Sequence, residues 1–72
     1  MMQKFGEKLH ILRRRRGMTM KELSALLGYS SHSFIAALEK GERMPSAALA
    51  VKLSQIFNVT TDQLLKDELD ID

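Results

Sequence analysis

The 72-residue chain has no cysteine, no tryptophan and a single proline. Without cysteine, neither a disulfide nor a thiolate zinc site can hold the fold together, and this composition suits a cytosolic protein. The two histidines, His10 and His32, lack the partners that a metal site needs, so we expect no metal and no cofactor. The sequence shows no nucleophile with a base, no carboxylate pair and no phosphate-binding loop, which argues against an enzyme with a small-molecule substrate.

Long apolar runs are absent as well. No segment approaches the roughly 18–20 apolar residues of a membrane-spanning helix, and the N-terminus lacks the apolar region of a signal peptide. We therefore expect a soluble, cytoplasmic protein without a membrane partner. A chain of this length is enough for one small domain, which buries only about 60% of the surface that the unfolded chain exposes.

The net charge is small but unevenly distributed. Nine basic and four acidic residues lie in positions 1–43, whereas two basic and five acidic residues lie in positions 44–72. The net charge of +2 therefore divides into a basic first part and an acidic second part. The basic part can face a polyanion while the acidic part stays away from it.

The spacing of apolar residues predicts an all-α protein with five helices. We expect helices over about residues 3–16, 20–27, 32–40 and 46–57, with a short fifth helix after Thr60. Thr19 with Glu22, and Thr60 with Gln63, have the spacing of capping boxes, which satisfy backbone N–H groups at helix starts. The apolar residues expected to face inward are Phe5, Leu9, Leu12, Leu23, Leu26, Leu27, Phe34, Ile35, Leu38, Leu49, Leu53, Ile56, Phe57, Leu64 and Leu65.

Residues 19–40 have the pattern of two short helices joined by a tight turn. Gly28 follows an apolar stripe and can adopt the left-handed conformation that ends a helix, and Ser30 or Ser31 can cap the next helix. Two short helices bent about a glycine form a helix-turn-helix unit, whose second helix can enter the DNA major groove.

The outer face of the helix over residues 32–40 is small and nearly uncharged. This face consists of Ser33, Ala36 and Lys40, flanked by His32 and Ala37. A solvated helix face usually carries long charged side chains, so the small residues indicate close approach to a partner. The alternative is that alanine stands there only because it is a good helix former.

Two charged segments leave alternatives open. The run Arg13–Arg16 is either a solvated helix end beside the negative pole of the helix dipole or a source of phosphate contacts. We expect a domain over residues 1–65, followed by an acidic C-terminal tail over residues 66–72. We expect this tail to be either disordered or packed against another copy of the chain.

Six segments, taken in order, resemble the phage repressor and Cro type of helix-turn-helix protein, often called the Xre family. They are F-G-x-x-L-x-x-L-R from Phe5, T-x-x-E-L from Thr19, L-G-Y from Leu27, I-x-x-L-E-x-G from Ile35, P-S from Pro45 and N-V-T-T-D-x-L-L from Asn58. The resemblance covers residues 5–65. It implies a five-helix lambda-repressor-like DNA-binding domain whose third helix is the recognition helix.

The same resemblance, combined with the outer face of the third helix, implies a set of site residues. The expected base contacts are Ser31, His32, Ser33, Ala36 and Ala37. The expected DNA-backbone contacts are Thr19, Met20, Ser30, Lys40, Arg43 and Ser46. The resemblance also implies an ion pair between Arg13 and Glu39 that joins the first helix to the third.

The sequence departs from the family pattern at several points. Between Gly28 and Glu39 it has one residue more than the commonest pattern, which lengthens the turn or the start of the third helix. Met20 stands where the family usually has a glutamine that contacts phosphate, and methionine cannot donate that hydrogen bond. Ala36 and Ala37 offer only apolar contact, so bidentate base contacts, worth about 1–3 kcal/mol each, are missing.

Two functions from different classes therefore remain open. The first is sequence-specific binding of double-stranded DNA by a homodimer that regulates transcription, for which we expect repression. The second is a protein-interaction module of antitoxin-like or adaptor type, in which the small outer face docks on a partner protein. Salt separates them, because DNA affinity falls steeply with ionic strength and apolar docking does not.

Overall fold

The computed structural model describes residues 3–72, so residues 1 and 2 of the expected 1–65 domain lie outside the described residues. Its five helices confirm the all-α prediction, and no strand occurs in this part of the chain. The helices are α1 (Phe5–Arg15), α2 (Met20–Leu27), α3 (Ser33–Lys40), α4 (Ala47–Phe57) and α5 (Thr61–Leu65). None of the helices in residues 3–72 has the length and apolar character needed to cross a bilayer.

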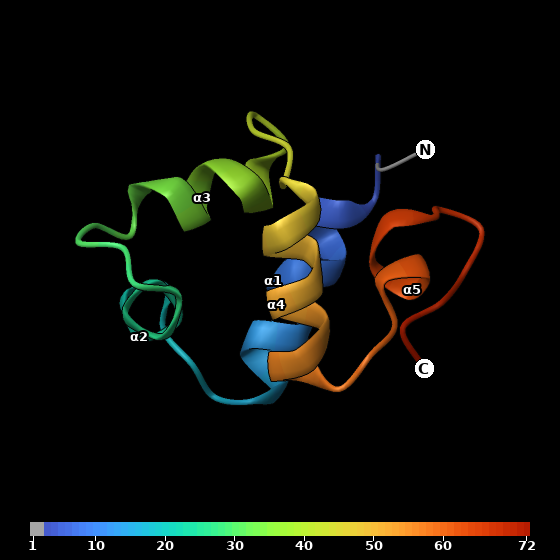
Figure 1. The fold of residues 1–72 in the computed structure, drawn as a ribbon, viewed down its shortest axis with the longest axis horizontal. Helices are drawn as coiled ribbons and strands as arrows, with labels where there is room; N and C mark the ends of the chain where they lie inside the picture. The colour runs from blue at the N-terminus through green and yellow to red at the C-terminus, as the bar shows by residue number, and fades with distance from the viewer. Residues whose placement is uncertain (1–2) are drawn as a thin grey trace.

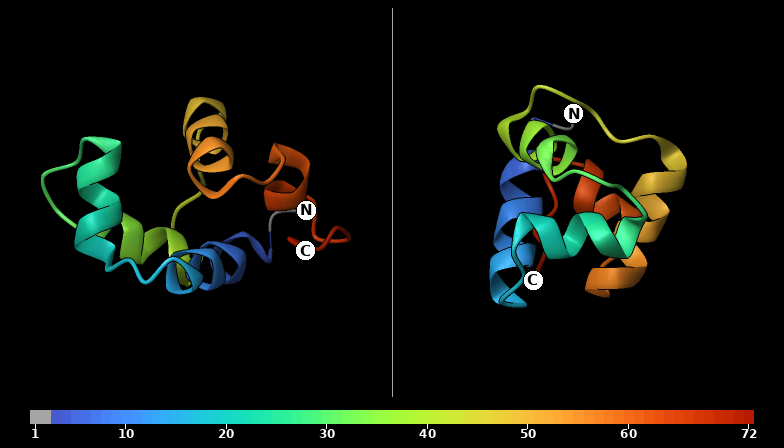
Figure 2. Two further views of the ribbon diagram at one scale, coloured as in Figure 1. Left: turned by 90° about the horizontal axis from the view of Figure 1, so that it is seen from below. Right: turned by 90° about the vertical axis from the view of Figure 1, so that its left-hand side faces the viewer.

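Helix α1 packs against both α3 and α5, α2 packs against α3, and α4 packs against α5. Figures 1 and 2 show α2 and α3 at one end of the molecule and α5 with the C-terminus at the other. Side chains from all five helices meet in one core, which consists of Phe5, Leu9, Leu12, Leu23, Leu27, Ile35, Leu38, Leu49, Leu53, Phe57 and Leu64. The helix-turn-helix pair thus forms one end of the domain.

Side-chain caps fix where three of the helices begin. In the capping box of α2, the Thr19 hydroxyl accepts a hydrogen bond from the Glu22 N–H at 3.0 Å, and the Glu22 carboxylate accepts from the Thr19 N–H at 2.8 Å. Helix α5 has the second predicted capping box, and Ser46 caps α4. Gly28, with a φ of 84°, ends α2 in the left-handed region, as its position predicted.

The structure corrects several details of the helix predictions. Leu26 is 60% exposed, because the buried side of α2 is centred on Leu23 and Leu27 and Leu26 points about 100° away from Leu27. Ile56 is only partly buried and lies at the edge of the core. Helices α1 and α3 also begin later than predicted, at Phe5 and Ser33.

The C-terminal tail folds back along α1 of its own chain, so the expectation of disorder was wrong, whereas packing of the tail on another copy stays a prediction. The buried Lys8 ammonium donates to the backbone carbonyls of Gln63, Lys66 and Leu69 at 2.6, 2.8 and 2.7 Å. Two carboxylates add to this attachment. Asp67 accepts from the backbone N–H of Lys4 at 2.9 Å, and Asp72 accepts from the Arg15 guanidinium at 2.7 Å.

Candidate nucleic-acid interface

A buried ion pair fixes α3 on α1. Arg13 Nε lies 2.6 Å from Glu39 Oε2 and Arg13 Nη2 lies 3.1 Å from Glu39 Oε1. The two side chains are only 7% and 5% exposed. Arg13 also donates to the backbone carbonyl of Met18, at 2.8 Å, in the segment that leads into α2. One guanidinium therefore links α1 to α3 and to the connection before α2.

His10 joins this pair from the same side of α1. Its Nδ1 lies 2.9 Å from Glu39 Oε1, although half of the His10 side chain remains exposed. Burial raises the pKa of Glu39, but the hydrogen bonds from Arg13 and His10 outweigh it, and the pKa falls below the ordinary value of 4.5. The hydrogen bond with Glu39 raises the pKa of Arg13. The carboxylate is therefore ionised near neutral pH.

A glycine allows α1 and α3 to approach closely. A Cβ atom on Gly6 would lie 2.7 Å from the carbonyl oxygen of Leu38 and closer still to that of Glu39. Both oxygens belong to the backbone and cannot move aside without moving α3. The position that follows Phe5 thus needs glycine, because any side chain there would push α3 away from α1.

The polar start of α3 stands in solvent. Ser31, His32 and Ser33 are exposed, whereas Ala36 and Ala37 are half-buried farther along the helix. The Ser31 hydroxyl accepts from the Ser33 N–H at 3.2 Å. The N-cap residue of α3 is nevertheless His32, and no side chain caps this helix, so the prediction of a cap at Ser30 or Ser31 was wrong.

The expected backbone contacts lie at both ends of the helix-turn-helix unit and, for Ser30, in the turn between its two helices. Thr19, Ser30, Lys40, Arg43 and Ser46 are exposed, and Met20 is half-buried. The Arg43 guanidinium carbon lies 5.2 Å from the centre of the Phe34 ring, which is within the range of a cation–π contact. Phe34 thus positions the cation of Arg43 beside the first turn of α3.

The arginine run has several separate roles. Arg13 is the buried partner of Glu39, Arg15 pairs with Asp72, and the Arg16 guanidinium carbon lies 5.8 Å from the centre of the Phe57 ring. Arg14 is exposed and lines a groove beside Thr19 and Met20, at the start of α2. The side chain of Arg14 has no partner among residues 3–72, and it lies beside Thr19 and Met20, two of the expected DNA-backbone contacts.

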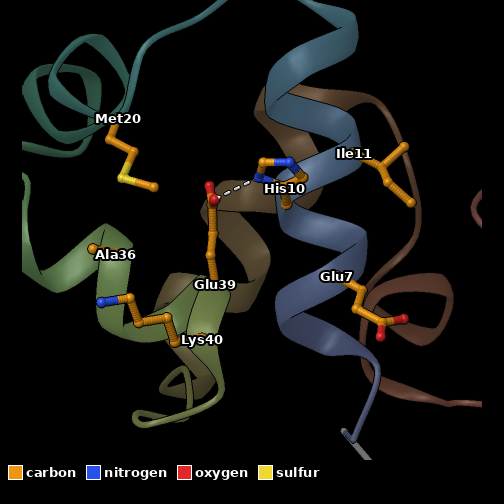
Figure 3. A pocket seen from close by; sticks show the side chains of 7 residues that line it. All are labelled: Glu7, His10, Ile11, Met20, Ala36, Glu39 and Lys40. Carbon is orange, nitrogen blue, oxygen red and sulfur yellow. Dashed lines mark hydrogen bonds and ion pairs between the residues drawn. The ribbon is translucent and has the colours of Figure 1, made fainter.

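A groove of about 470 Å³ lies between α1 and the helix-turn-helix unit (Figure 3). Three of its lining residues, Met20, Ala36 and Lys40, are among the DNA contacts expected from the sequence. Glu39 lines the groove as well, and α1 supplies its other wall, formed by Glu7, His10 and Ile11. These three residues carry no local motif, so sequence analysis missed them. Their position beside α3 depends on the packing of helices distant in the sequence.

The sequence of this chain is similar to those of known helix-turn-helix proteins. A family model described as helix-turn-helix matches residues 9–64. The chain belongs to the helix-turn-helix family. This helix-turn-helix protein is 30% identical over 64 residues to an uncharacterized HTH-type transcriptional regulator, YazB, of Bacillus subtilis (strain 168). The aligned part is 89% of this chain and 91% of that protein. No solved structure matches the chain significantly.

The family match confirms the resemblance to the phage repressor and Cro type and the five-helix lambda-repressor-like fold. Within residues 3–72 of this helix-turn-helix protein, no three acidic or histidine side chains gather as a metal ion would require.

Proposed function

We propose that this protein binds double-stranded DNA sequence-specifically, as a homodimeric transcriptional repressor, with α3 in the major groove. The family and the regulator that the chain resembles support DNA binding and regulation of transcription. A repressor acts where the chromosome is, so the proposal includes a cytoplasmic location.

One observation carries this proposal: the polar start of α3 is not covered by its own chain. Ser31, His32 and Ser33 are exposed, with the cations of Lys40 and Arg43 exposed beyond them. The acidic tail lies along α1 and near α5, toward the other end of the molecule (Figure 2). A duplex that approaches α3 thus meets polar and basic groups.

The proposal of a dimer follows from the small size of this surface. One domain offers few phosphate contacts, and a second copy on a half-site about one turn of DNA away doubles them. If each half neutralises about four phosphates, the logarithm of the affinity falls with the logarithm of salt concentration at a slope near −7.

Fluorescence anisotropy with a labelled random-sequence duplex tests this function. We expect binding in dilute buffer that is lost by about 0.3 M salt, because phosphate contacts release counterions. Arg43→Ala should flatten the slope by about 2 in a dimer, which loses one phosphate contact in each half. The matched control is Lys52→Ala on the exposed side of α4. Absence of binding at low salt would contradict the proposal.

The groove beside α3 favours a second candidate, a protein-interaction module. Met20, Ala36 and Ile11 give that groove an apolar lining, which suits a side chain of a partner protein. Such docking changes little with ionic strength. The salt titration therefore separates the two functions.

A further inference from the structure

An aromatic pair flanks the start of α3. Tyr29, in the turn after α2, is 41% exposed, and Phe34, in the first turn of α3, is half-buried. Their ring centroids lie 5.0 Å apart, and the ring planes are inclined at 60°. Tilted rings at this distance attract one another, because the positive edge of one ring faces the negative face of the other. The Phe34 ring is therefore supported by a residue of the turn.

The backbone of the turn fixes Tyr29 in its place. The Tyr29 N–H donates to the Ser24 carbonyl at 2.9 Å, across Gly28 in its left-handed conformation. This hydrogen bond belongs to the termination of α2 and restricts the direction in which the chain leaves that helix. The Tyr29 side chain thus starts from an ordered backbone position.

Arg43 reaches the aromatic pair from the other end of α3. Figure 1 shows the turn before α3 and the loop after it at opposite ends of this helix. The Arg43 N–H donates to the Ala37 carbonyl at 3.3 Å, which anchors that loop on α3. The Arg43 guanidinium carbon nevertheless lies 5.2 Å from the centre of the Phe34 ring, in the first turn. The side chain of Arg43 therefore runs back along α3 toward its start.

A guanidinium held by a ring differs from one held by a carboxylate. Glu39 occupies two nitrogen atoms of Arg13. Asp72 does the same for Arg15. No carboxylate in the described part of the chain pairs with Arg43, whose charge is stabilised by the ring. The N–H groups of Arg43 therefore remain available, and they form a planar fork that suits two oxygens of one phosphate.

A restricted arginine binds a phosphate at a lower entropic cost. A long side chain that is free in solution loses rotamer freedom when it is immobilised against DNA. A ring contact that already restricts the guanidinium removes part of this loss. The restriction also places the cation near Ser31, His32 and Ser33, the expected base contacts at the start of α3.

We propose that Tyr29 and Phe34 are positioning residues, which hold the Arg43 guanidinium beside the first turn of α3 for a DNA phosphate. This inference rests on the proposed function, because it concerns how one expected backbone contact is made. The two aromatic residues act through Arg43 and make no contact of their own with the duplex. A phosphate bound there fixes the register of α3 on the duplex without selecting a base.

Fluorescence anisotropy with the random-sequence duplex at low salt tests this role through a double-mutant cycle. Phe34→Leu keeps an apolar side chain but removes the ring, and it should bind about fivefold more weakly than the wild type. In an Arg43→Ala background the same substitution should change the affinity by less than about twofold, because the positioned cation is gone. Phe34→Tyr retains the ring and should stay within about twofold of the wild type.

Tyr29 offers a matched pair of variants. Tyr29→Leu removes the ring that supports Phe34 and should weaken binding about threefold. Tyr29→Phe removes only the hydroxyl and should leave the affinity unchanged. An equal loss in both variants would show that the hydroxyl itself contacts the duplex, which would overturn a role through the ring.

NMR of the free protein measures the contact in the absence of DNA. The ring current of Phe34 should shift the side-chain protons of Arg43 upfield, and this shift should disappear in Phe34→Leu. Urea denaturation checks that the variant is folded. If Phe34→Leu does not fold, Tyr29→Leu replaces it in the cycle with Arg43→Ala, since the Tyr29 side chain lies at the surface.

The outcomes separate the two proposals. If loss of the ring costs as much affinity in the Arg43→Ala background as in the wild type, the positioning role is overturned while DNA binding stands. Absence of the ring-current shift in the wild type overturns that role as well. If the wild type binds no duplex in dilute buffer, the proposed function fails and this inference fails with it.

Discussion

At the scale of single residues, Arg13 and Glu39 determine how α3 is held. Their buried charges stabilise one another, and His10 adds a third hydrogen bond to the same carboxylate. The family resemblance predicted the pairing of Arg13 with Glu39, but it did not predict His10. The ring lies off the apolar stripe of α1, and only the packing of α1 on α3 brings it to Glu39.

Arg13→Ala should lower the free energy of unfolding by about 3–5 kcal/mol, because it leaves the Glu39 carboxylate buried without its main partner. Urea denaturation followed by circular dichroism measures this loss. Arg14→Ala, one position along on the exposed side of α1, should change stability by less than about 0.5 kcal/mol. Equal effects of the two substitutions would show that the ion pair does not stabilise the fold.

Acid should weaken the protein partly through Glu39. Its pKa in the folded state lies below the ordinary value of 4.5, so its contribution is complete above that value and is lost as the pH falls through the lowered pKa. Glu39→Gln should therefore be less stable at pH 7 and lose less stability on acidification. Thermal melts between pH 7 and pH 3 measure both effects. The hydrogen bond from Arg15 also lowers the pKa of Asp72. Glu39→Gln should therefore still lose some stability in acid, because Asp72 becomes protonated there.

At the scale of helices, local chemistry predicted most of the boundaries. Thr19 and Thr60 mark helix starts through their capping boxes, and Gly28 ends α2, because all three act on backbone groups a few residues away. Leu26 was misplaced for a physical reason. The spacing of apolar residues does not show which of several leucines on a short helix lies outside the buried face. The packing of α2 on α3 determines which leucine is exposed.

Gly6→Ala tests the close approach of α1 and α3. The added methyl group would meet two backbone carbonyls of α3, so the helices must separate, and we expect a loss of about 1–3 kcal/mol in the free energy of unfolding. Glu7→Ala on the exposed neighbouring position serves as the control in the same urea titration. An unchanged or higher stability of Gly6→Ala would mean that α1 and α3 are not in contact at this point.

At the scale of the whole molecule, Lys8 joins the two ends of the chain. Its ammonium is bound by three carbonyls 55–61 residues away. No local pattern in the sequence could indicate such a contact, and the sequence of residues 66–72 left open only disorder or packing on another copy. Lysine also has an apolar stem, which packs in the interior while the ammonium reaches these carbonyls. The attachment keeps the acidic tail on α1 and away from the start of α3.

Lys8→Met should release the tail. The substitution preserves the apolar stem but removes the donor from three carbonyls, and we expect a loss of at least about 1.5 kcal/mol in stability. Hydrogen exchange should show faster exchange of backbone amides in residues 66–72. Lys4→Met, at an exposed position of the same region, should leave exchange in the tail unchanged. Undiminished protection of the tail in Lys8→Met would contradict this role.

The account depends most on α3 entering the major groove as part of a two-fold dimer. Selection of binding sites from random double-stranded DNA, with the wild-type protein at low salt, tests this claim most directly. We predict enrichment of a two-fold symmetric sequence whose half-sites lie about 10 base pairs apart, centre to centre. Recovery of no enriched sequence, with no duplex retained in dilute buffer, would contradict the account.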